Sequence, residues 1–75
     1  MRELTLYTTA GCHLCEQAET LLDAAGIRFV SVDIEADLAL LERYGVRIPV
    51  VQDSNGRELG WPFDGTMLRE FVEPQ

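Results

Sequence analysis

The sequence contains no lysine, only one histidine and two cysteines, and no long hydrophobic run. All six basic residues are arginines, and the thirteen Asp and Glu residues give the chain a net charge of −7. Because this charge repels phosphate backbones and anionic lipid surfaces, we expect neither nucleic acid nor a membrane as a partner. Two cysteines and one histidine are also too few for a closed zinc site of four cysteine and histidine ligands within one chain.

A chain of 75 residues has room for one domain with a small core, so we expect a single domain over residues 1–75. Hydrophobic residues make up 47% of the chain and charged residues 25%, as in soluble globular proteins. The start of the sequence shows neither the apolar segment nor the cleavage pattern of a signal peptide, which favours the cytoplasm. Structural disulfides are rare there, so a cysteine pair is expected to be catalytic or metal-binding.

The first half of the chain alternates strand and helix patterns. Residues 4–8 alternate as in a strand, and a helical pattern follows until Gly26. Residues 27–32 form a second short, β-branched run. Asp33 and Glu35 then open a second helical stretch, which Gly45 ends. The apolar residues at helical spacing are Leu14, Ala18, Leu21, Leu22 and Ala25 in the first helix, and Leu38, Leu41 and Tyr44 in the second.

The second half predicts a hairpin and a last helix. Residues 49–52 and 57–59 flank residues 53–56, which contain Asn55-Gly56, a dipeptide typical of a hairpin between antiparallel strands. Asp64 is placed to cap the last helix, which we expect to end at Pro74. Its apolar side carries Met67, Leu68, Phe71 and Val72. The complete order is βαβαββα, which is an α/β fold.

Cys12 and Cys15 stand three residues apart, where the first strand gives way to the first helix. Two thiols at this spacing can close into a disulfide and reopen. Cys15 shares a helical stripe with Ala18 and Leu22, so it should face the core, whereas Cys12 is left at the exposed N-terminal end. Because backbone N–H groups and the helix dipole favour a thiolate there, we expect Cys12 to be the attacking thiol and Cys15 the resolving thiol.

Residues 7–15, with the Cys-His-Leu-Cys sequence, and residues 44–50, with Ile48-Pro49, together resemble the short glutaredoxin-like form of the thioredoxin fold. The resemblance spans essentially the whole chain. It implies a four-stranded mixed sheet with the first strand at its centre, helices on both faces and a cis bond before Pro49. It also implies that Ile48 and Pro49 lie beside the cysteines as the edge that binds substrate, with the Ile48 backbone hydrogen-bonded to an extended segment or to the cysteinyl part of glutathione.

Two charged residues could bind the rest of such a substrate. Arg47 is near Pro49 and could pair with a carboxylate of a bound tripeptide or partner, or it is a plain solvated charge. By the resemblance, Asp64 stands where glutaredoxins bind the γ-glutamyl end of glutathione, and its alternative role is a simple helix cap. Ahead of Asp64 the chain has one glycine where glutaredoxins commonly have two, and Trp61 and Phe63 are expected to pack in the core or at its rim.

His13 lies between the cysteines and has two interpretations. It is either an exposed residue of the first helical turn or a tuning group that stabilises the Cys12 thiolate and makes the disulfide more oxidising. Neither interpretation makes His13 the nucleophile.

The leading hypothesis is a monomeric, cytoplasmic thiol–disulfide oxidoreductase with a role in cell redox homeostasis. It would act on protein disulfides or glutathione mixed disulfides through Cys12 and Cys15, with no tightly bound cofactor and, by analogy, with glutathione as reductant. Two alternatives from other classes stay open: a dimeric carrier of a metal or iron–sulfur cluster that uses Cys12, and a redox-inert adaptor that uses the fold for protein contacts. The alternative without chemistry is that the two cysteines are ordinary small hydrophobic residues.

Overall fold

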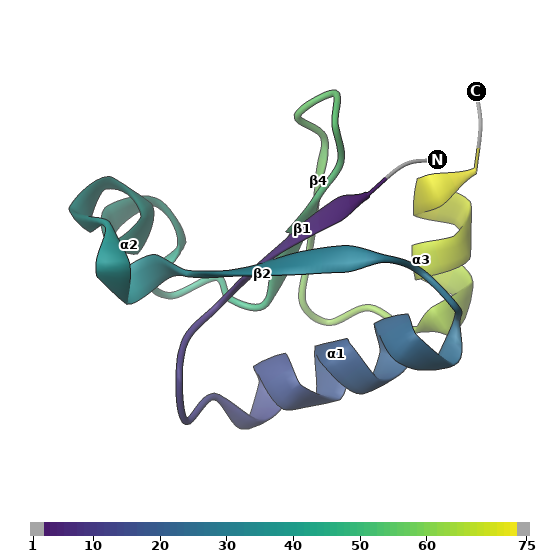
Figure 1. The fold of residues 1–75 in the computed structure, drawn as a ribbon, viewed down its shortest axis with the longest axis horizontal. Helices are drawn as coiled ribbons and strands as arrows, with labels where there is room; N and C mark the ends of the chain where they lie inside the picture. The colour runs from purple at the N-terminus through teal and green to yellow at the C-terminus, as the bar shows by residue number, and fades with distance from the viewer. Residues whose placement is uncertain (1–2, 74–75) are drawn as a thin grey trace.

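The computed structural model describes residues 3–73, and its four strands form one mixed sheet in the order β2-β1-β3-β4 (Figure 1). The central strand β1 runs parallel to β2 and antiparallel to β3, and β4 pairs antiparallel with β3. The strands are β1 (Leu4–Thr8), β2 (Phe29–Asp33), β3 (Val50–Gln52) and β4 (Glu58–Gly60). The βαβαββα order and the thioredoxin-like four-stranded mixed sheet expected from the sequence are therefore confirmed.

One face of the sheet is covered by α1 (His13–Ala24) and α3 (Gly65–Val72), which contact each other. Alternate residues of each strand point to this face, so Leu4 and Leu6 of β1 are buried against the helices while their neighbours point the other way. The buried residues of this main core are Leu4, Leu6, Ala18, Leu22, Val51, Phe63 and Leu68. Trp61 packs against the main core and meets Phe63 edge to face, as expected for core or rim residues.

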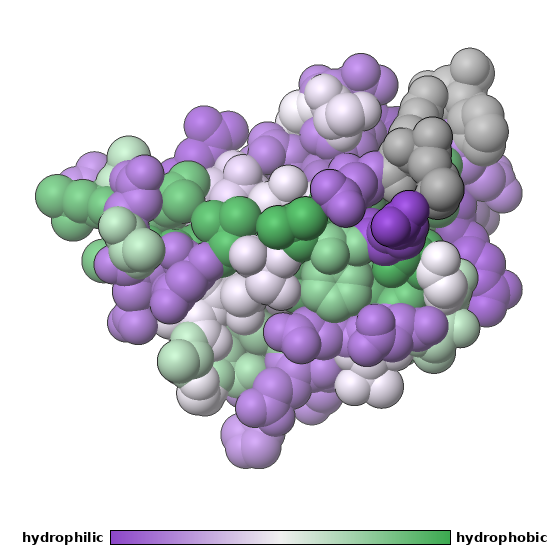
Figure 2. Space-filling view, in the orientation of Figure 1, coloured by the Kyte–Doolittle hydropathy of each residue, from purple (hydrophilic) through white to green (hydrophobic). Residues whose placement is uncertain are grey.

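The opposite face carries a smaller core under α2 (Leu38–Tyr44), built from Ile34, Tyr44 and Val50. Because α2 has only two turns, apolar side chains stay exposed on this side, among them Val30 of β2 and Leu38. Figure 2 shows hydrophobic residues reaching from the α2 end across the middle of the side that carries β2.

The second helical stretch is not one helix from Asp33, and that part of the prediction is wrong. A short 3₁₀ turn, η1 (Ile34–Ala36), precedes α2. The Asp33 carboxylate accepts the Glu35 N–H at 2.9 Å, and the Asp37 carboxylate accepts the Ala39 N–H at the same distance. Asp37 has an extended backbone with φ −142°, so each aspartate starts its own segment and the chain turns between them.

The hairpin predicted across residues 53–56 forms between β3 and β4, and its turn is not a two-residue turn at Asn55-Gly56. Such a turn would need positive φ at both residues, and among the described residues only glycines have positive φ. Gly56 adopts φ +86° and donates its N–H to the Asp53 carbonyl, and Asp53 donates its own N–H to the Arg57 carbonyl. The loop therefore has three residues and ends on a glycine bulge, so that β4 begins at Glu58.

The remaining boundaries follow the expected caps. Asp64 precedes α3, which ends at Val72, and Pro74 lies outside the described residues. The Ile48-Pro49 bond is cis, as the resemblance implies, and the Trp61-Pro62 bond is also cis, which the sequence did not predict. No helix in residues 3–73 is long and apolar enough to span a membrane.

Candidate functional site

Cys12 and Cys15 are joined by a disulfide, and their Cα atoms are 5.2 Å apart. Cys12 is the N-cap of α1, and its sulfur accepts the Cys15 N–H at 3.1 Å. Only 1% of Cys15 is exposed, whereas Cys12 is half-buried. The two cysteines therefore differ in the way that the helical stripe predicts, and Cys12 is the more accessible residue of the pair.

The helix itself sets this difference. Ala18 and Leu22, which follow Cys15 on the same stripe, are fully buried against the sheet. Cys12 precedes the first helical residue and has an extended backbone, with φ −92° and ψ 106°, so its side chain turns back over the first N–H groups of the helix. A sulfur anion at Cys12 would face the unpaired backbone donors of that helical turn.

Sheet register brings Pro49 to the same end of the sheet as the cysteines. β1 and β3 pair antiparallel with Tyr7 opposite Val50, so the next residues outward are Thr8 and Pro49. Thr8 is the last residue of β1 and leads directly into the loop that ends at Cys12. Pro49 is fully buried, and its carbonyl accepts the Trp61 N–H at 3.1 Å. This bond connects Pro49 to the residue that follows β4.

Ile48 has one of its two backbone hydrogen-bonding groups occupied. Its N–H is donated to the Tyr44 carbonyl at 3.1 Å, and the Arg47 N–H is donated to the same carbonyl at 2.8 Å. The backbone donor that the resemblance assigned to a substrate is thus engaged in the turn after α2. The Ile48 carbonyl is the group that remains for an extended substrate segment.

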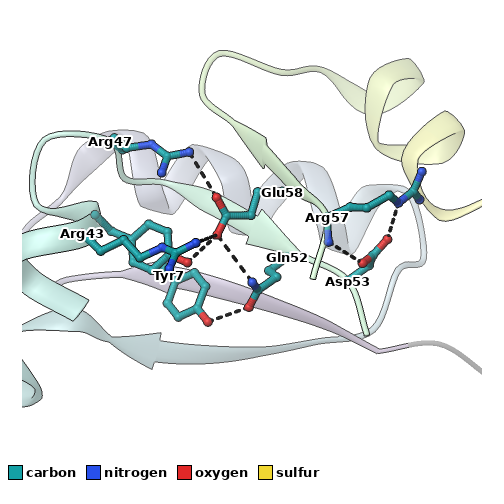
Figure 3. Close-up of polar contacts among 8 residues, drawn as sticks. Tyr7, Arg43, Arg47, Gln52, Asp53, Arg57 and Glu58 are labelled. Atoms are coloured by element: carbon teal, nitrogen blue, oxygen red, sulfur yellow. Dashed lines mark hydrogen bonds and ion pairs between the residues drawn. The ribbon is translucent and has the colours of Figure 1, made fainter. Parts of the chain in front are cut away.

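The Arg47 side chain belongs to a group of interacting residues centred on Glu58 (Figure 3). The Glu58 carboxylate accepts hydrogen bonds from the Tyr44 hydroxyl and, at 3.2 Å, from the Arg47 guanidinium. The Arg43 guanidinium lies 3.7 Å from the same carboxylate, and the Gln52 amide donates to it at 3.4 Å. Arg47 is therefore paired within the protein, and its exposed edge is what a substrate carboxylate could reach.

The ionisation of this group is shaped by the same contacts. The Tyr44 hydrogen bond, helped by the Arg47 and Arg43 charges, holds the pKa of Glu58 below its ordinary value against the effect of burial. Burial, together with the hydrogen bond to Glu58, raises the pKa of Tyr44 to about 12. At neutral pH the group consists of a neutral tyrosine, a carboxylate and two guanidinium groups.

The other two predicted site residues lie at helix starts. Asp64 caps α3, since its carboxylate accepts the Met67 N–H at 2.8 Å. The His13 side chain is 94% exposed, and its Nδ1 lies 3.9 Å from a carboxylate oxygen of Glu16. His13 thus points away from the core at the cysteine end of α1.

Comparison with known proteins gives the family. Residues 3–73 match the family model described as the glutaredoxin-like domain (DUF836). The chain belongs to this glutaredoxin-like family.

Solved structures of similar chains agree with the glutaredoxin-like assignment. The X-ray structure of protein XcR50 from X. campestris is 50% identical, covers 92% of this chain and 93% of its own, and has a TM-score of 0.87. The solution NMR structure of protein Ne2328 from Nitrosomonas europaea is 26% identical, covers 96% and 92%, and has a TM-score of 0.73. The thioredoxin-like protein BC3987, at 17% identity and a TM-score of 0.69, shows the same fold. No curated protein matches the sequence.

Sequence reasoning missed the central residues of the group around Glu58. The sequence places Tyr44 on the apolar side of a helix and in the 44–50 segment of the resemblance, and it gives neither Glu58 nor Gln52 a role at the site. β4 has only three residues and no alternating burial, so no local pattern marks Glu58 as part of this group.

Within residues 3–73 there is no cluster of three or more His, Cys, Asp or Glu side chains arranged to hold a metal ion. A carrier that ligates a cluster between two chains would use fewer ligands from each, so this observation bears only on a site within one chain.

Proposed function

We propose that this glutaredoxin-like protein is a thiol–disulfide oxidoreductase in which Cys12 is the nucleophile and Cys15 the resolving thiol. The observation that carries the proposal is the difference between the two sulfurs of one disulfide. Cys12 is accessible at the helix N-cap, and Cys15 is buried one turn further on. A pair of structural cysteines has no need of a partly accessible, N-capping member.

The reduced protein would act in two exchange steps. The Cys12 thiolate attacks one sulfur of a substrate disulfide, forming a Cys12–substrate bond while the second substrate sulfur leaves as a thiolate. Cys15 then loses its proton to solvent and attacks Cys12, which closes the Cys12–Cys15 disulfide and releases the first substrate sulfur. Two electrons pass from the dithiol to the substrate, and both released thiolates take up protons from water.

Backbone groups at the start of α1 support the charged state that the first step needs. The N–H of Cys15 already donates to the Cys12 sulfur in the disulfide, and the same donor would stabilise a thiolate. Glu16 in the first turn opposes it, and His13 Nδ1 lies 3.9 Å from that carboxylate. His13 would thus tune the site through Glu16 and would not take part in the sulfur chemistry.

The Ile48-Pro49 segment is the proposed substrate edge. Its support is the register that places Pro49 at the cysteine end of the sheet, next to the loop from Thr8 to Cys12. Arg47 and Asp64 would bind carboxylate and amino groups of the substrate by their exposed edges. The expected substrates are protein disulfides or glutathione mixed disulfides, with glutathione as the reductant, and the protein is expected to work as a monomer in the cytoplasm.

A redox titration tests the proposal. The purified protein is equilibrated with graded mixtures of reduced and oxidised glutathione, quenched in acid and read by intact mass. We expect a two-proton mass loss with a midpoint between about −270 and −120 mV, the range of working dithiol oxidoreductases. Cys12→Ser, which cannot form the disulfide, is the matched control and should show no such loss.

Two other outcomes would replace the proposal. A pair that never oxidises across the series would leave the adaptor hypothesis. A visible absorption band in freshly purified protein, lost in Cys12→Ser, would favour a cluster carrier, because a simple dithiol protein does not absorb visible light.

A further inference from the structure

The loop between α2 and Pro49 is linked to β4 by one carboxylate, while Ile48 of the loop packs against the smaller core. This loop covers residues 45–48, and Val46 within it is fully exposed. Glu58 reaches it from β4 at two points, through the Tyr44 hydroxyl at the end of α2 and through the Arg47 guanidinium. Glu58 thus contacts the residues on either side of the exposed part of the loop.

The contact with Tyr44 is transmitted to the substrate edge through the backbone. The Tyr44 carbonyl accepts the N–H groups of Arg47 and Ile48, so the position of Tyr44 sets the position of the residue before Pro49. Pro49 on the other side is fixed by its hydrogen bond with Trp61. The Ile48-Pro49 segment is therefore held from its C-terminal side by the sheet and from its N-terminal side by the Tyr44–Glu58 contact.

The other contacts of the Tyr44 side chain are packing contacts. Tyr44 is 2% exposed, it packs with Ile34 and Val50 in the smaller core, and its ring stacks on Tyr7 with the centroids 4.3 Å apart. These packing contacts lack the directionality of a hydrogen bond. The hydroxyl–carboxylate bond is the directional contact that joins the Tyr44 side chain to β4.

We infer that Glu58 is a positioning residue for the substrate edge, which sets where the Ile48 carbonyl meets an extended peptide bound beside Cys12. The inference rests on the proposed function. Glu58 takes no part in the exchange of sulfur bonds, so its loss should weaken the binding of substrates with a peptide backbone and leave the Cys12–Cys15 chemistry intact.

The kinetic test compares two disulfides. One is a short peptide with an internal disulfide, and the other is bis(2-hydroxyethyl) disulfide, which has no backbone to bind. We expect Glu58→Ala to raise KM for the peptide about tenfold, the effect of one lost buried hydrogen bond, with kcat within about twofold of the wild type. The rate with the small disulfide and the midpoint of the glutathione titration should not change.

Two variants complete the comparison. Glu58→Gln keeps an oxygen that accepts the Tyr44 hydroxyl, and it should recover most of the peptide KM. Glu70→Ala removes one carboxylate from an exposed position on α3 and serves as the control for net charge. It should behave as the wild type with both disulfides.

A measurement that needs no activity follows the loop directly. In Glu58→Ala the amide hydrogens of Arg47 and Ile48, both donated to Tyr44, should exchange about tenfold faster or more. The amide of Ala25, donated to Leu21 in α1, should exchange at the wild-type rate. Equal acceleration at all three would show general destabilisation and overturn the positioning role.

The outcomes separate this inference from the function on which it rests. A wild-type protein that reduces neither disulfide would overturn the proposed function and the inference with it. A wild-type protein that reduces both, beside a Glu58→Ala variant with an unchanged peptide KM, would overturn the inference alone.

Discussion

The carboxylate of Asp53 is almost completely buried, and the guanidinium of Arg57, four residues further on, lies 2.7 Å from it. The Asp53 carboxylate also accepts the N–H groups of Asn55 and Arg57, so the whole β3–β4 loop is organised around one side chain. Arg57 in turn donates to the Phe71 carbonyl at 2.8 Å. This pair therefore connects the hairpin to α3 at the edge of the main core.

The pair predicts a loss of stability in acid. The hydrogen bonds from Arg57 hold the pKa of Asp53 below its ordinary value. A depressed pKa in the folded state gives stability that is present above the unfolded pKa of about 3.9 and is lost as the pH falls through the folded value. Urea unfolding at a series of pH values should show a steep decline below about pH 4.

Asp53→Asn should reduce this acid decline and lower stability at pH 7, because the amide cannot pair with Arg57. Asp23→Asn, at an exposed position on α1, is the matched control and should follow the wild type. Equal slopes for the wild type and Asp53→Asn would mean that Asp53 does not contribute to the acid transition.

The backbone conformation of Gly56 predicts that a substitution there lowers the stability of the fold. It holds φ +86°, a region that costs a side-chain-bearing residue about 1–2 kcal/mol. Gly56→Ala should lower the free energy of unfolding by about 1 kcal/mol. In Gly60→Ala the new Cβ meets no atom within 4 Å and φ is not positive, so this variant should be close to neutral. A neutral Gly56→Ala would show that the loop is not a glycine bulge.

Two substitutions at Asp64 distinguish its role as a helix cap from a role in ligand binding. Asp64→Ala removes the acceptor of the Met67 N–H and should cost about 1 kcal/mol, whereas Asp64→Asn keeps an acceptor and should cost only a few tenths. Because Asp64→Asn folds normally on this account, a change in its KM for glutathione mixed disulfides would report binding alone. Thermal unfolding of both variants checks the first step, and equal loss in both would contradict the capping role.

The raised pKa of Tyr44 predicts that the protein loses stability as the pH rises into the alkaline range. Its pKa is raised to about 12 by burial and by the hydrogen bond to Glu58, so the neutral phenol is favoured by the folded state. The stability that this gives is present below the unfolded pKa of about 10 and is lost as the pH rises toward 12. In Tyr7→Phe, which keeps the ring stack, the phenolate absorbance of the one remaining tyrosine should appear near pH 12. Titration near pH 10 instead would mean that the phenol is exposed to solvent.

The features that the sequence predicted well are those with a local pattern. The alternation of Leu4 and Leu6, the helical spacing from Cys15 to Leu22 and the cap at Asp64 each follow from neighbours a few residues apart, and all three are found in the structure. The cis bond before Pro49 came from the resemblance, because residue preference alone favours trans.

The features that the sequence did not predict depend on residues that are far apart in the chain. Tyr7 binds Gln52 across 45 residues, and Tyr44 binds Glu58 across 14, so no local pattern marks either bond. The hairpin itself was predicted, but the role of the buried Asp53 carboxylate in organising its loop was not, because Asp53 resembles an ordinary turn aspartate in sequence.

The central claim is that Cys12 attacks and Cys15 resolves, and the two single serine variants test it most directly. Each is mixed with oxidised glutathione, quenched in acid over time and read by intact mass. Cys15→Ser should accumulate one stable glutathione adduct per chain at Cys12, and Cys12→Ser should react at least about tenfold more slowly, because its remaining thiol is buried. Equal rates, or faster reaction at Cys15, would contradict the account.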